Sequence, residues 1–254
     1  MRLEDLRIIV TGAAGGLGRH FILELLRAGA AVAAGDTNAA GLRSLKTEAE
    51  ELPGRLMVGK LDVTDEVSAA EFVAAAAEQL GGLNSLVNSA GILRDGRLVY
   101  REGETIHKLT LAQWRKVLDV NLAGPFLMTR EVAARMLADG TPGGVVVNLS
   151  SLSRAGNPGQ SNYAASKSGL DAATRTWALE LAPYGIRVGA VAPGVTETGF
   201  LQGISEEALA ALIDAIPVGR AGRPQEIWMA VRFILENDFF NGRVLEVDGG
   251  ARMA

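Results

Sequence analysis

The sequence contains no cysteine, and this absence excludes several classes of protein at once. Without thiols the chain cannot form a disulfide scaffold, a thiolate zinc site, an iron–sulfur centre or a cysteine nucleophile. Histidine is scarce too, because the chain has two, His20 and His107, which lie far apart in the sequence. A histidine-rich metal site is therefore not expected either, and we predict no metal ion.

The chain also lacks a charge excess and long apolar runs. Its 25 Lys and Arg stand against 29 Asp and Glu, a net charge of −4, whereas nucleic-acid binding needs a clustered basic excess. No uninterrupted apolar run reaches the roughly 18 residues that a membrane span requires, and the charged start Met1–Asp5 contains no signal-peptide core. We expect a cytoplasmic protein that binds neither nucleic acid nor membrane.

Aromatic residues are rare at 5%, although hydrophobic residues make up 48% of the 254 residues. Ala, Val, Leu and Ile must therefore fill the core, and 31 glycines favour close packing of helices on a sheet. About 150 residues per domain would allow one large domain or two small ones. No linker, composition break or internal repeat divides the chain, so we predict a single domain over residues 1–254.

Short apolar runs alternate with segments of helical period along the whole chain. We expect seven strands, at residues 6–10, 30–34, 56–58, 83–87, 145–149, 187–192 and 244–247. We expect helices at residues 17–29, 38–51, 65–80, 111–138, 162–182 and 224–236. Such alternation predicts an α/β fold, a doubly wound (Rossmann) parallel sheet of seven strands with helices on both faces.

A glycine-rich loop follows the first strand directly and opens the first helix. Gly12, Gly16 and Gly18 would allow a tight turn, a close backbone approach to a pyrophosphate, and close packing of the helix on the strand. The helix that starts there would direct its free N–H groups at the phosphates. A dinucleotide site is predicted from this position in the chain, the alternative being an ordinary flexible turn.

The second strand leads into Asp36, which lies 18 residues after Gly18. An acid at about this distance binds the adenosine ribose hydroxyls in dinucleotide sites. Its carboxylate would repel the 2′-phosphate of NADP, and residues 11–18 and Thr37 offer no Arg or Lys to offset that repulsion. NAD(H) is therefore predicted over NADP(H), the alternative role of Asp36 being a helix N-cap.

Tyr163 and Lys167 share one face of a predicted helix, because they are four positions apart in the sequence. A nearby ammonium would stabilise the phenolate and bring the tyrosine pKa towards working pH. Taken alone, such a pair is common on solvated helix faces. Ser150 and Ser151, however, lie where a predicted strand ends, which is where parallel sheets bind ligands.

Two asparagines are further candidate residues of this site. Asn88, with Ala90 and Gly91 after it, follows another strand end. Asn121 lies in an apolar helix, where a buried amide needs a hydrogen-bonding reason to exist. The alternative for Asn121 is a satisfied core amide that bridges helix and strand.

These motifs, in this order, resemble the short-chain dehydrogenase/reductase family over essentially the whole chain. The matching segments are Thr11-Gly12-x-x-x-Gly16-x-Gly18, Asp62-Val63, Asn88-Ser89-Ala90-Gly91, Tyr163-x-x-x-Lys167 and Pro193-Gly194-Val195-Thr196-Glu197-Thr198. The second place of the Asn88 segment is Ser, where the family has Asn. The resemblance implies an enzyme that transfers a hydride between a nicotinamide cofactor and a secondary alcohol or ketone.

The resemblance also implies roles for single residues. Tyr163 would be the acid/base, Lys167 would hold the nicotinamide ribose, and Asn121 would hold a water of a proton relay. A strand-end serine would bind the substrate carbonyl: spacing to the tyrosine points to Ser150, and spacing from the strand asparagine points to Ser151, which we favour. The residues expected to contact the cofactor are Gly12, Gly16, Leu17, Gly18, Asp36, Asp62, Val63, Asn88, Ala90, Gly91, Tyr163, Lys167, Pro193, Gly194, Thr196 and Thr198.

The substrate is less sharply indicated. Residues 195–216 lie where family members carry a substrate lid, and the apolar side chains there fit a partly hydrophobic substrate or an amphipathic helix on the core. The pattern is most similar to 3-oxoacyl-thioester reductases, but Tyr184 stands near where those acting on acyl carrier protein tend to have Arg. A sugar-alcohol or steroid substrate is the alternative within the family, and a non-catalytic dinucleotide-binding regulatory module is the alternative outside it.

Two further expectations concern the rest of the chain. Residues 92–110 form a longer and more charged segment than is usual at that place, an insertion without an assigned purpose. The apolar circumference of helices 111–138 and 162–182 predicts a homotetramer, with a dimer as the alternative.

Overall fold

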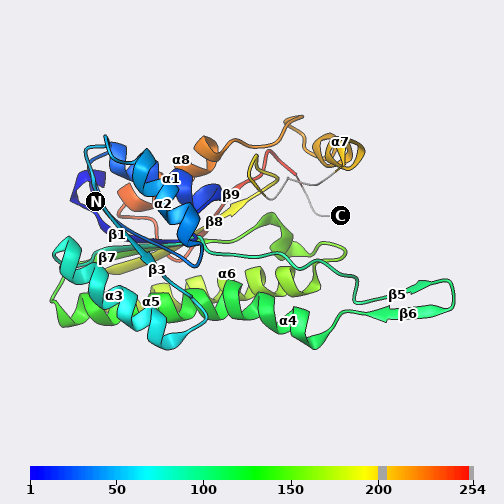
Figure 1. The fold of residues 1–254 in the computed structure, drawn as a ribbon, viewed down its shortest axis with the longest axis horizontal. Helices are drawn as coiled ribbons and strands as arrows, with labels where there is room; N and C mark the ends of the chain where they lie inside the picture. The colour runs from blue at the N-terminus through cyan, green and yellow to red at the C-terminus, as the bar shows by residue number, and fades with distance from the viewer. Residues whose placement is uncertain (200–204, 252–254) are drawn as a thin grey trace.

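The computed structural model describes residues 1–199 and 205–251 and contains the predicted seven-stranded parallel sheet (Figure 1). The strand order is β3-β2-β1-β4-β7-β8-β9. The strands of this sheet are β1 (Arg7–Thr11), β2 (Ala31–Asp36), β3 (Arg55–Lys60), β4 (Ser85–Asn88), β7 (Gly144–Leu149), β8 (Ile186–Pro193) and β9 (Val244–Val247). The order reverses direction between β1 and β4, which confirms the doubly wound class.

Helices cover both faces of the sheet, because each face carries its own apolar cluster. One layer consists of α1 (Gly16–Arg27), α2 (Ala39–Glu48) and α8 (Pro224–Glu236). The other consists of α3 (Glu66–Leu80), α4 (Leu111–Leu118), α5 (Gly124–Ala138) and α6 (Ser161–Leu181), and Figure 1 shows the two layers above and below the sheet. Strands buried from both sides explain the continuous apolar runs that predicted them.

The single helix predicted over residues 111–138 is interrupted. Between α4 and α5 the chain makes a π-helical turn over Asp119–Ala123. Pro125, at the start of α5, has no N–H to give to the carbonyl of Asn121 four residues earlier, so the α-helical ladder cannot continue through this point. Gly124 packs tightly as well, since a Cβ there would lie 2.8 Å from Val63 Cγ2. π-turns inside helices often mark functional sites.

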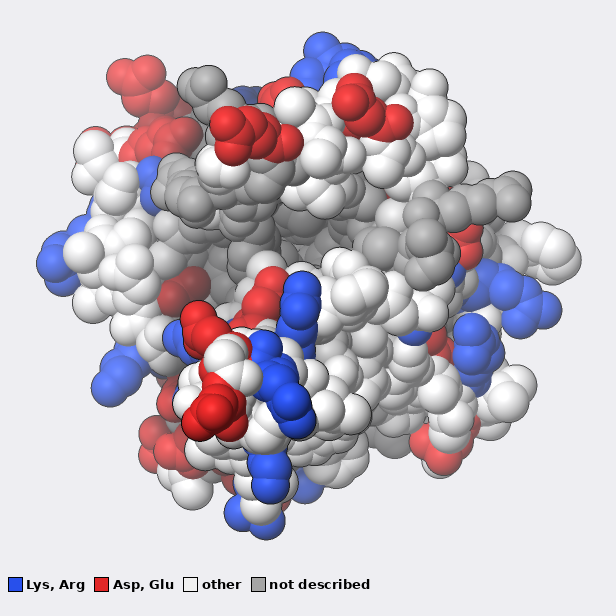
Figure 2. All heavy atoms as spheres, turned by 90° about the vertical axis from the view of Figure 1, so that its right-hand side faces the viewer, with Lys and Arg blue, Asp and Glu red and all other residues white. Residues whose placement is uncertain are grey.

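The inserted segment 92–110 contains a β-hairpin that sequence analysis did not predict. Strands β5 (Val99–Glu102) and β6 (Thr105–Lys108) pair antiparallel and project from the body of the molecule (Figure 1). The Tyr100 and His107 rings stack across the hairpin with centroids 4.7 Å apart. Acidic and basic side chains mix on this arm, which points at the viewer in Figure 2.

A buried polar ladder joins the centre of the sheet to the α5 and α6 layer. Asn88 Nδ2 donates to Asn148 Oδ1 at 2.9 Å and to Thr129 Oγ1 at 3.1 Å. Asn148 in turn donates to Thr174 Oγ1 at 2.9 Å. The ladder fixes β4 against β7, whose paired residues Asn88 and Asn148 face the same helices.

The predicted substrate lid is only partly described. Helix α7 (Glu206–Asp214) occupies most of its second half. Residues 200–204 of the predicted lid, which include the apolar Phe200 and Leu201, lie outside the described residues. The segment after α7 is tied to the chain near its end, because Val218 N–H donates to the Gly249 carbonyl at 3.1 Å.

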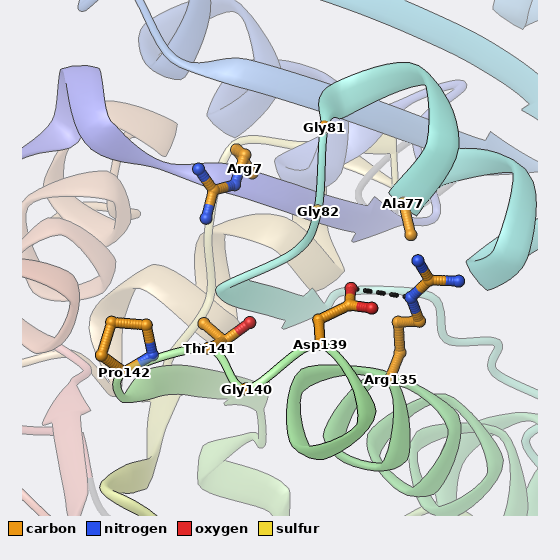
Figure 3. A pocket seen from close by; sticks show the side chains of 9 residues that line it. All are labelled: Arg7, Ala77, Gly81, Gly82, Arg135, Asp139, Gly140, Thr141 and Pro142. Atoms are coloured by element: carbon orange, nitrogen blue, oxygen red, sulfur yellow. Dashed lines mark hydrogen bonds and ion pairs between the residues drawn. The ribbon is translucent and has the colours of Figure 1, made fainter.

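A surface cavity of about 470 Å³ lies at the edge of the sheet where β1 begins, opposite the strand ends discussed below (Figure 3). The ion pair between Arg135 and Asp139, with Nε to Oδ2 at 2.7 Å, forms one of its walls. None of the residues predicted for the active site lines it.

No helix in the described part of the chain has the length and apolar character needed to cross a membrane.

Candidate active site

The loops after β1 and β4 pack directly against each other at the point where the strand order reverses. Thr11 Oγ1 accepts hydrogen bonds from the backbone N–H of Ser89, at 3.1 Å, and of Ala90, at 3.0 Å. Gly12 has φ of +70°, and a Cβ there would lie 2.8 Å from the Ala90 Cα. The position requires glycine both for its backbone conformation and for the close approach.

The other two glycines of the loop have the different environments that their motif predicts. A Cβ on Gly18 would lie 2.3 Å from the Gly12 carbonyl oxygen, so Gly18 allows α1 to pack on the end of β1. Gly16 has φ of +55° and open space where a Cβ would lie. Helix α1 begins at Gly16, and Leu17 follows within its first turn, where N–H groups have no partner inside the helix. This open glycine at a helix N-terminus fits a pyrophosphate, because backbone donors can approach it without a side chain between them.

Asp36 ends β2 beside this loop. Its Oδ2 accepts the Ala14 N–H at 2.9 Å, and its Oδ1 accepts the Asn38 N–H at 2.8 Å. The side chain that caps α2 is Asn38, which accepts the Gly41 N–H at 3.0 Å, so Asp36 does not serve as the N-cap considered above. Each carboxylate oxygen retains further acceptor capacity for a ribose hydroxyl.

Arg19 in helix α1, just after the glycine loop, is already paired with an acid. It donates from Nε to Glu48 Oε2 at 2.9 Å and from Nη1 to the Gly41 carbonyl at 3.3 Å. Because Glu48 neutralises Arg19, the end of β2 keeps the negative character that Asp36 gives it.

Asp62 and Val63 follow β3, the neighbour of β2. The Thr64 hydroxyl and N–H both donate to Asp62 Oδ1, at 2.7 and 2.9 Å, and these hydrogen bonds hold the pKa of Asp62 below its usual range. Val63 is buried against Gly124. The pair therefore lies at the same edge of the sheet as Asp36, where cofactor contacts were predicted.

Asn88 at the end of β4 and the three residues that follow it have different roles. The Asn88 side chain lies inside the protein, in the ladder with Asn148 and Thr129, so its amide does not point to the glycine loop. Ala90 instead forms the wall against Gly12. A Cβ on Gly91 would lie 3.5 Å from Asn121 Oδ1 and 3.8 Å from Lys167 Nζ. Because Gly91 has no side chain, the space between the loop and these two side chains stays open.

Asn121 lies in the π-helical turn and is fully buried. Its Oδ1 accepts the Ile92 N–H at 2.9 Å, and its Nδ2 donates to the Ile92 carbonyl at 3.0 Å. The side chain is thus a satisfied amide that bridges the helix and the loop after β4. In a regular α-helix the backbone carbonyl of Asn121 would accept a hydrogen bond from the residue four positions later. That residue is Pro125, which has no N–H to donate.

Lys167 is buried, with 4% of its surface exposed, and its Nζ donates to the Leu149 carbonyl at 2.6 Å. Burial lowers the pKa of Lys167 to about 8, and the nearby Asp171 carboxylate opposes this change. The Lys167 Nζ lies 5.6 Å from the centroid of the Tyr163 ring, so the two side chains share one side of α6 as their spacing predicts.

The pKa of Tyr163 differs from the expectation drawn from Lys167 alone. Burial raises the pKa of the phenol above its usual value, a hydrogen bond from Ser151 lowers it, and the Asp95 carboxylate raises it. Desolvation is the largest of these effects, so the phenol stays protonated at neutral pH.

The two serines after β7 point to different partners. Ser151 contacts the Tyr163 phenol, and its Oγ also accepts the Ser153 N–H at 3.1 Å. Ser150 is buried, and its hydroxyl lies near the Asp171 carboxylate, on the same side as Asn148 two residues earlier. Alternation along the strand explains the separation, and it brings Ser151, rather than Ser150, to the tyrosine.

The segment after β8 completes the same edge of the sheet. Pro193 ends the strand, and the Gly194 N–H donates to the Val247 carbonyl at 2.9 Å. Thr196 is buried and donates to the Gly194 carbonyl at 3.1 Å. Thr198 lies half-buried near the start of the proposed lid.

Two parts of the site were missed by sequence analysis. Asn162 is fully buried, and its Nδ2 donates to the Arg94 carbonyl at 3.0 Å, which holds the start of the inserted segment beside Tyr163. Asp171, one turn beyond Lys167, is buried and forms an ion pair with the half-buried Arg154, with Nε to Oδ2 at 2.7 Å. The sequence did contain a sign of Asp171, because it lies four positions after Lys167 and therefore on the same face of the helix.

Comparisons with known proteins agree with this geometry. The profile of the family described as "Enoyl-(Acyl carrier protein) reductase" matches residues 12–252. A 3-oxoacyl-[acyl-carrier-protein] reductase of Thermotoga maritima is 41% identical over 98% of this chain and 99% of its own. A cis-4-hydroxycyclohexanecarboxylate dehydrogenase of Sinomonas cyclohexanicum is 36% identical over 95% of this chain and 94% of its own.

Solved structures of similar chains share the fold. A putative short-chain alcohol dehydrogenase from Sinorhizobium meliloti superposes with a TM-score of 0.89 at 33% identity, covering 97% of this chain and 96% of its own. A short-chain type dehydrogenase/reductase from Mycobacterium marinum superposes with a TM-score of 0.90 at 27% identity, covering 98% of this chain and 96% of its own. The chain belongs to the short-chain dehydrogenase/reductase family of oxidoreductases.

Proposed function

We propose that this protein is an NAD(H)-dependent oxidoreductase that interconverts a secondary alcohol and a ketone, with Tyr163 as the acid/base. The observation that supports this most is the convergence of Ser151 and Lys167 on the Tyr163 side chain, at the strand ends beside the glycine loop. Parallel α/β sheets bind their ligands at this edge.

In ketone reduction, Tyr163 and Ser151 both act on the substrate oxygen. Tyr163 donates its hydroxyl proton to the substrate oxygen, and Ser151 donates a hydrogen bond to the same oxygen as charge develops there. A nicotinamide cofactor held at this edge would supply the hydride for the carbonyl carbon, and with the proton from Tyr163 this would convert the ketone to an alcohol. Alcohol oxidation uses the same groups in reverse.

Lys167 and Asn121 support the proton transfer. The Lys167 ammonium stabilises the phenolate that remains after proton donation and binds the ribose hydroxyls of the cofactor. Because the Asn121 amide is occupied at both ends by Ile92, a relay water is held by its backbone carbonyl, which Pro125 leaves without an α-helical partner.

A 3-oxoacyl or 3-hydroxyacyl compound, or a related small hydroxy compound, is the proposed substrate class. The names of the Thermotoga and Sinomonas relatives mention compounds of similar chemistry. Each compound has an oxo or hydroxyl group on a carbon skeleton that also carries a carboxyl function. Tyr184, at the end of the catalytic helix region, is 55% exposed and presents no cation to an acidic carrier protein. We therefore favour a free or small-thioester substrate over docking of acyl carrier protein, with sugar alcohols and steroids as the alternative.

Cofactor choice gives the first test. Asp36 should make NADH the better cofactor, because its carboxylate repels a 2′-phosphate and Glu48 neutralises Arg19. In the variant Asp36→Ala/Thr37→Arg, the ratio of kcat/KM for NADH to that for NADPH should fall by about tenfold or more, the factor that corresponds to about 1.4 kcal/mol. Initial rates with both cofactors measure it. A wild-type preference for NADPH would show that Asp36 does not set the choice.

The acid/base step gives the second test. Tyr163→Phe removes one oxygen and keeps the ring, so folding and NADH binding should persist while turnover falls by about 10²–10⁴-fold or more. Turnover is followed at the nicotinamide absorbance band with a panel of ketones and alcohols. Tyr184→Phe, at an exposed tyrosine, is the control and should keep wild-type turnover. Near-normal turnover in Tyr163→Phe would leave the non-catalytic dinucleotide-binding module as the better account.

The two serines give a third test. Ser151→Ala should lose far more activity than Ser150→Ala, by about 10²-fold, because one hydrogen-bond donor to a developing oxyanion is worth that much. The assay compares kcat for the two variants with the same substrate. If Ser150→Ala proves the more damaging change, the substrate oxygen lies on the Asp171 side of the strand end and the assignment is reversed.

Assembly gives the fourth test. Leu179 on α6 and Phe126 on α5 are 78% and 45% exposed, and among the described residues β9 is the last strand at its end of the sheet. Such apolar surfaces and edges need cover, which supports a homotetramer, with a dimer as the alternative. Sedimentation equilibrium at micromolar concentration should show four chains per particle. A single chain under these conditions would contradict the proposal.

A further inference from the structure

Asp171 occupies the same face of α6 as the proposed catalytic pair. Tyr163, Lys167 and Asp171 follow one another at intervals of four residues, so each lies about one turn from the next. Asp171 is 4% exposed, although buried carboxylates are rare unless they are paired. The mechanism described above makes no use of it.

Arg154 is the paired group, and it connects Asp171 to the rest of the site. Its Nε contacts Asp171 Oδ2 at 2.7 Å, and its Nη1 donates to the Ser151 carbonyl at 3.3 Å. Its remaining nitrogen pairs with Glu246 on β9. One guanidinium therefore joins the backbone of the substrate-binding serine, the buried carboxylate and the last strand of the sheet.

The second oxygen of the carboxylate is not used by this pair. Asp171 Oδ1 and Ser150 Oγ are both buried, and neither makes a hydrogen bond of normal geometry with another described residue. Burial raises the pKa of Asp171, whereas Ser150, Arg154, Arg175 and Lys167 lower it. The carboxylate is thus placed between two cations, with Arg154 on one side and Lys167 on its own helix.

Lys167 needs such a partner, because its ammonium is removed from water. The groups around Lys167 are the Leu149 carbonyl on β7, the Tyr163 ring and Asp171. Asp95, on the loop after β4, acts on Tyr163 rather than on Lys167. Among these neighbours, Asp171 is the one whose negative charge favours the cationic lysine.

We propose that Asp171, held in place by Arg154, is a positioning residue that keeps Lys167 cationic and oriented toward Tyr163 and the cofactor ribose. This proposal rests on the proposed function, because it assigns the cationic lysine to cofactor binding. A purely structural role for the same ion pair would stabilise the fold and would leave the titration of Lys167 unchanged.

The experiment measures NADH binding by tryptophan fluorescence quenching over a pH range of about two units on either side of the Lys167 pKa of about 8. In the wild-type protein the affinity should fall as pH rises, because deprotonation removes the charge that binds the ribose. Lys167→Met should abolish this pH dependence, which assigns the midpoint to Lys167.

Asp171→Asn should move the midpoint downward by about one unit, since an opposite charge nearby raises the pKa of a cation. Asp171→Glu, which keeps the charge, should restore it. The matched control is Asp139→Asn, which breaks a similar 2.7 Å Asp–Arg pair at the far edge of the sheet and should leave the midpoint at its wild-type value.

The outcomes separate the two proposals. Wild-type protein that binds NADH at no pH contradicts the proposed function. Wild-type protein with a pH-dependent affinity, together with an unchanged midpoint in Asp171→Asn, overturns the role of Asp171. If Asp171→Asn does not fold, the double variant Arg154→Met/Asp171→Leu decides in its place, because it replaces both charges of the ion pair with apolar side chains and leaves neither charge unpaired. It should still lower the Lys167 midpoint, since Asp171 is the charge that acts on Lys167, and an unchanged midpoint overturns the inference.

Discussion

The contact between the loops after β1 and β4 is the constraint on which the rest of the site depends. Thr11 accepts the Ser89 and Ala90 amides, and Gly12 lies against Ala90 so closely that no side chain fits between them. This contact closes the glycine loop on one side and sets the position of Gly91 on the other. Gly91 then leaves the space beside Asn121 and Lys167, so the proposed cofactor and catalytic halves of the site share one backbone junction.

A second theme is that burial, rather than the number of charges, sets the chemistry of this site. Lys167 and Tyr163 both resist ionisation because each is withdrawn from water. Ser151 offsets part of this cost for the phenol, and Asp171 offsets part of it for the amine. The site thus holds polarised groups whose protonation responds to small changes in neighbouring charge, which suits a reversible proton transfer.

The parts of the fold and site that were predictable follow from local rules. The seven strands, the glycine loop and the Tyr163–Lys167 spacing each depend on residues close in sequence. The position of Ser151 beside Tyr163 follows from the register along a single strand. The parts that were missed depend on residues brought together by folding. Arg154 meets Glu246 only through the sheet, the π-helical turn reflects tight packing of Gly124 on Val63 as well as Pro125, and the β5–β6 hairpin has no core to impose an apolar pattern.

The topology of the sheet has a consequence for how the molecule is made. Every neighbouring pair of strands in it is parallel, and β1 pairs with β4 in a register that joins Ile8 to Ser85. Strand β1 therefore gains its partner β4 only after a long stretch of chain has been synthesised, and the separation between Arg154 and Glu246 is longer still. Contacts between residues so distant in sequence form slowly. A nascent or truncated chain that ends before β9 lacks Glu246, so the Asp171–Arg154 pair would form without its third member. Such a chain would expose an incomplete sheet edge and an incomplete charge cluster at the same time.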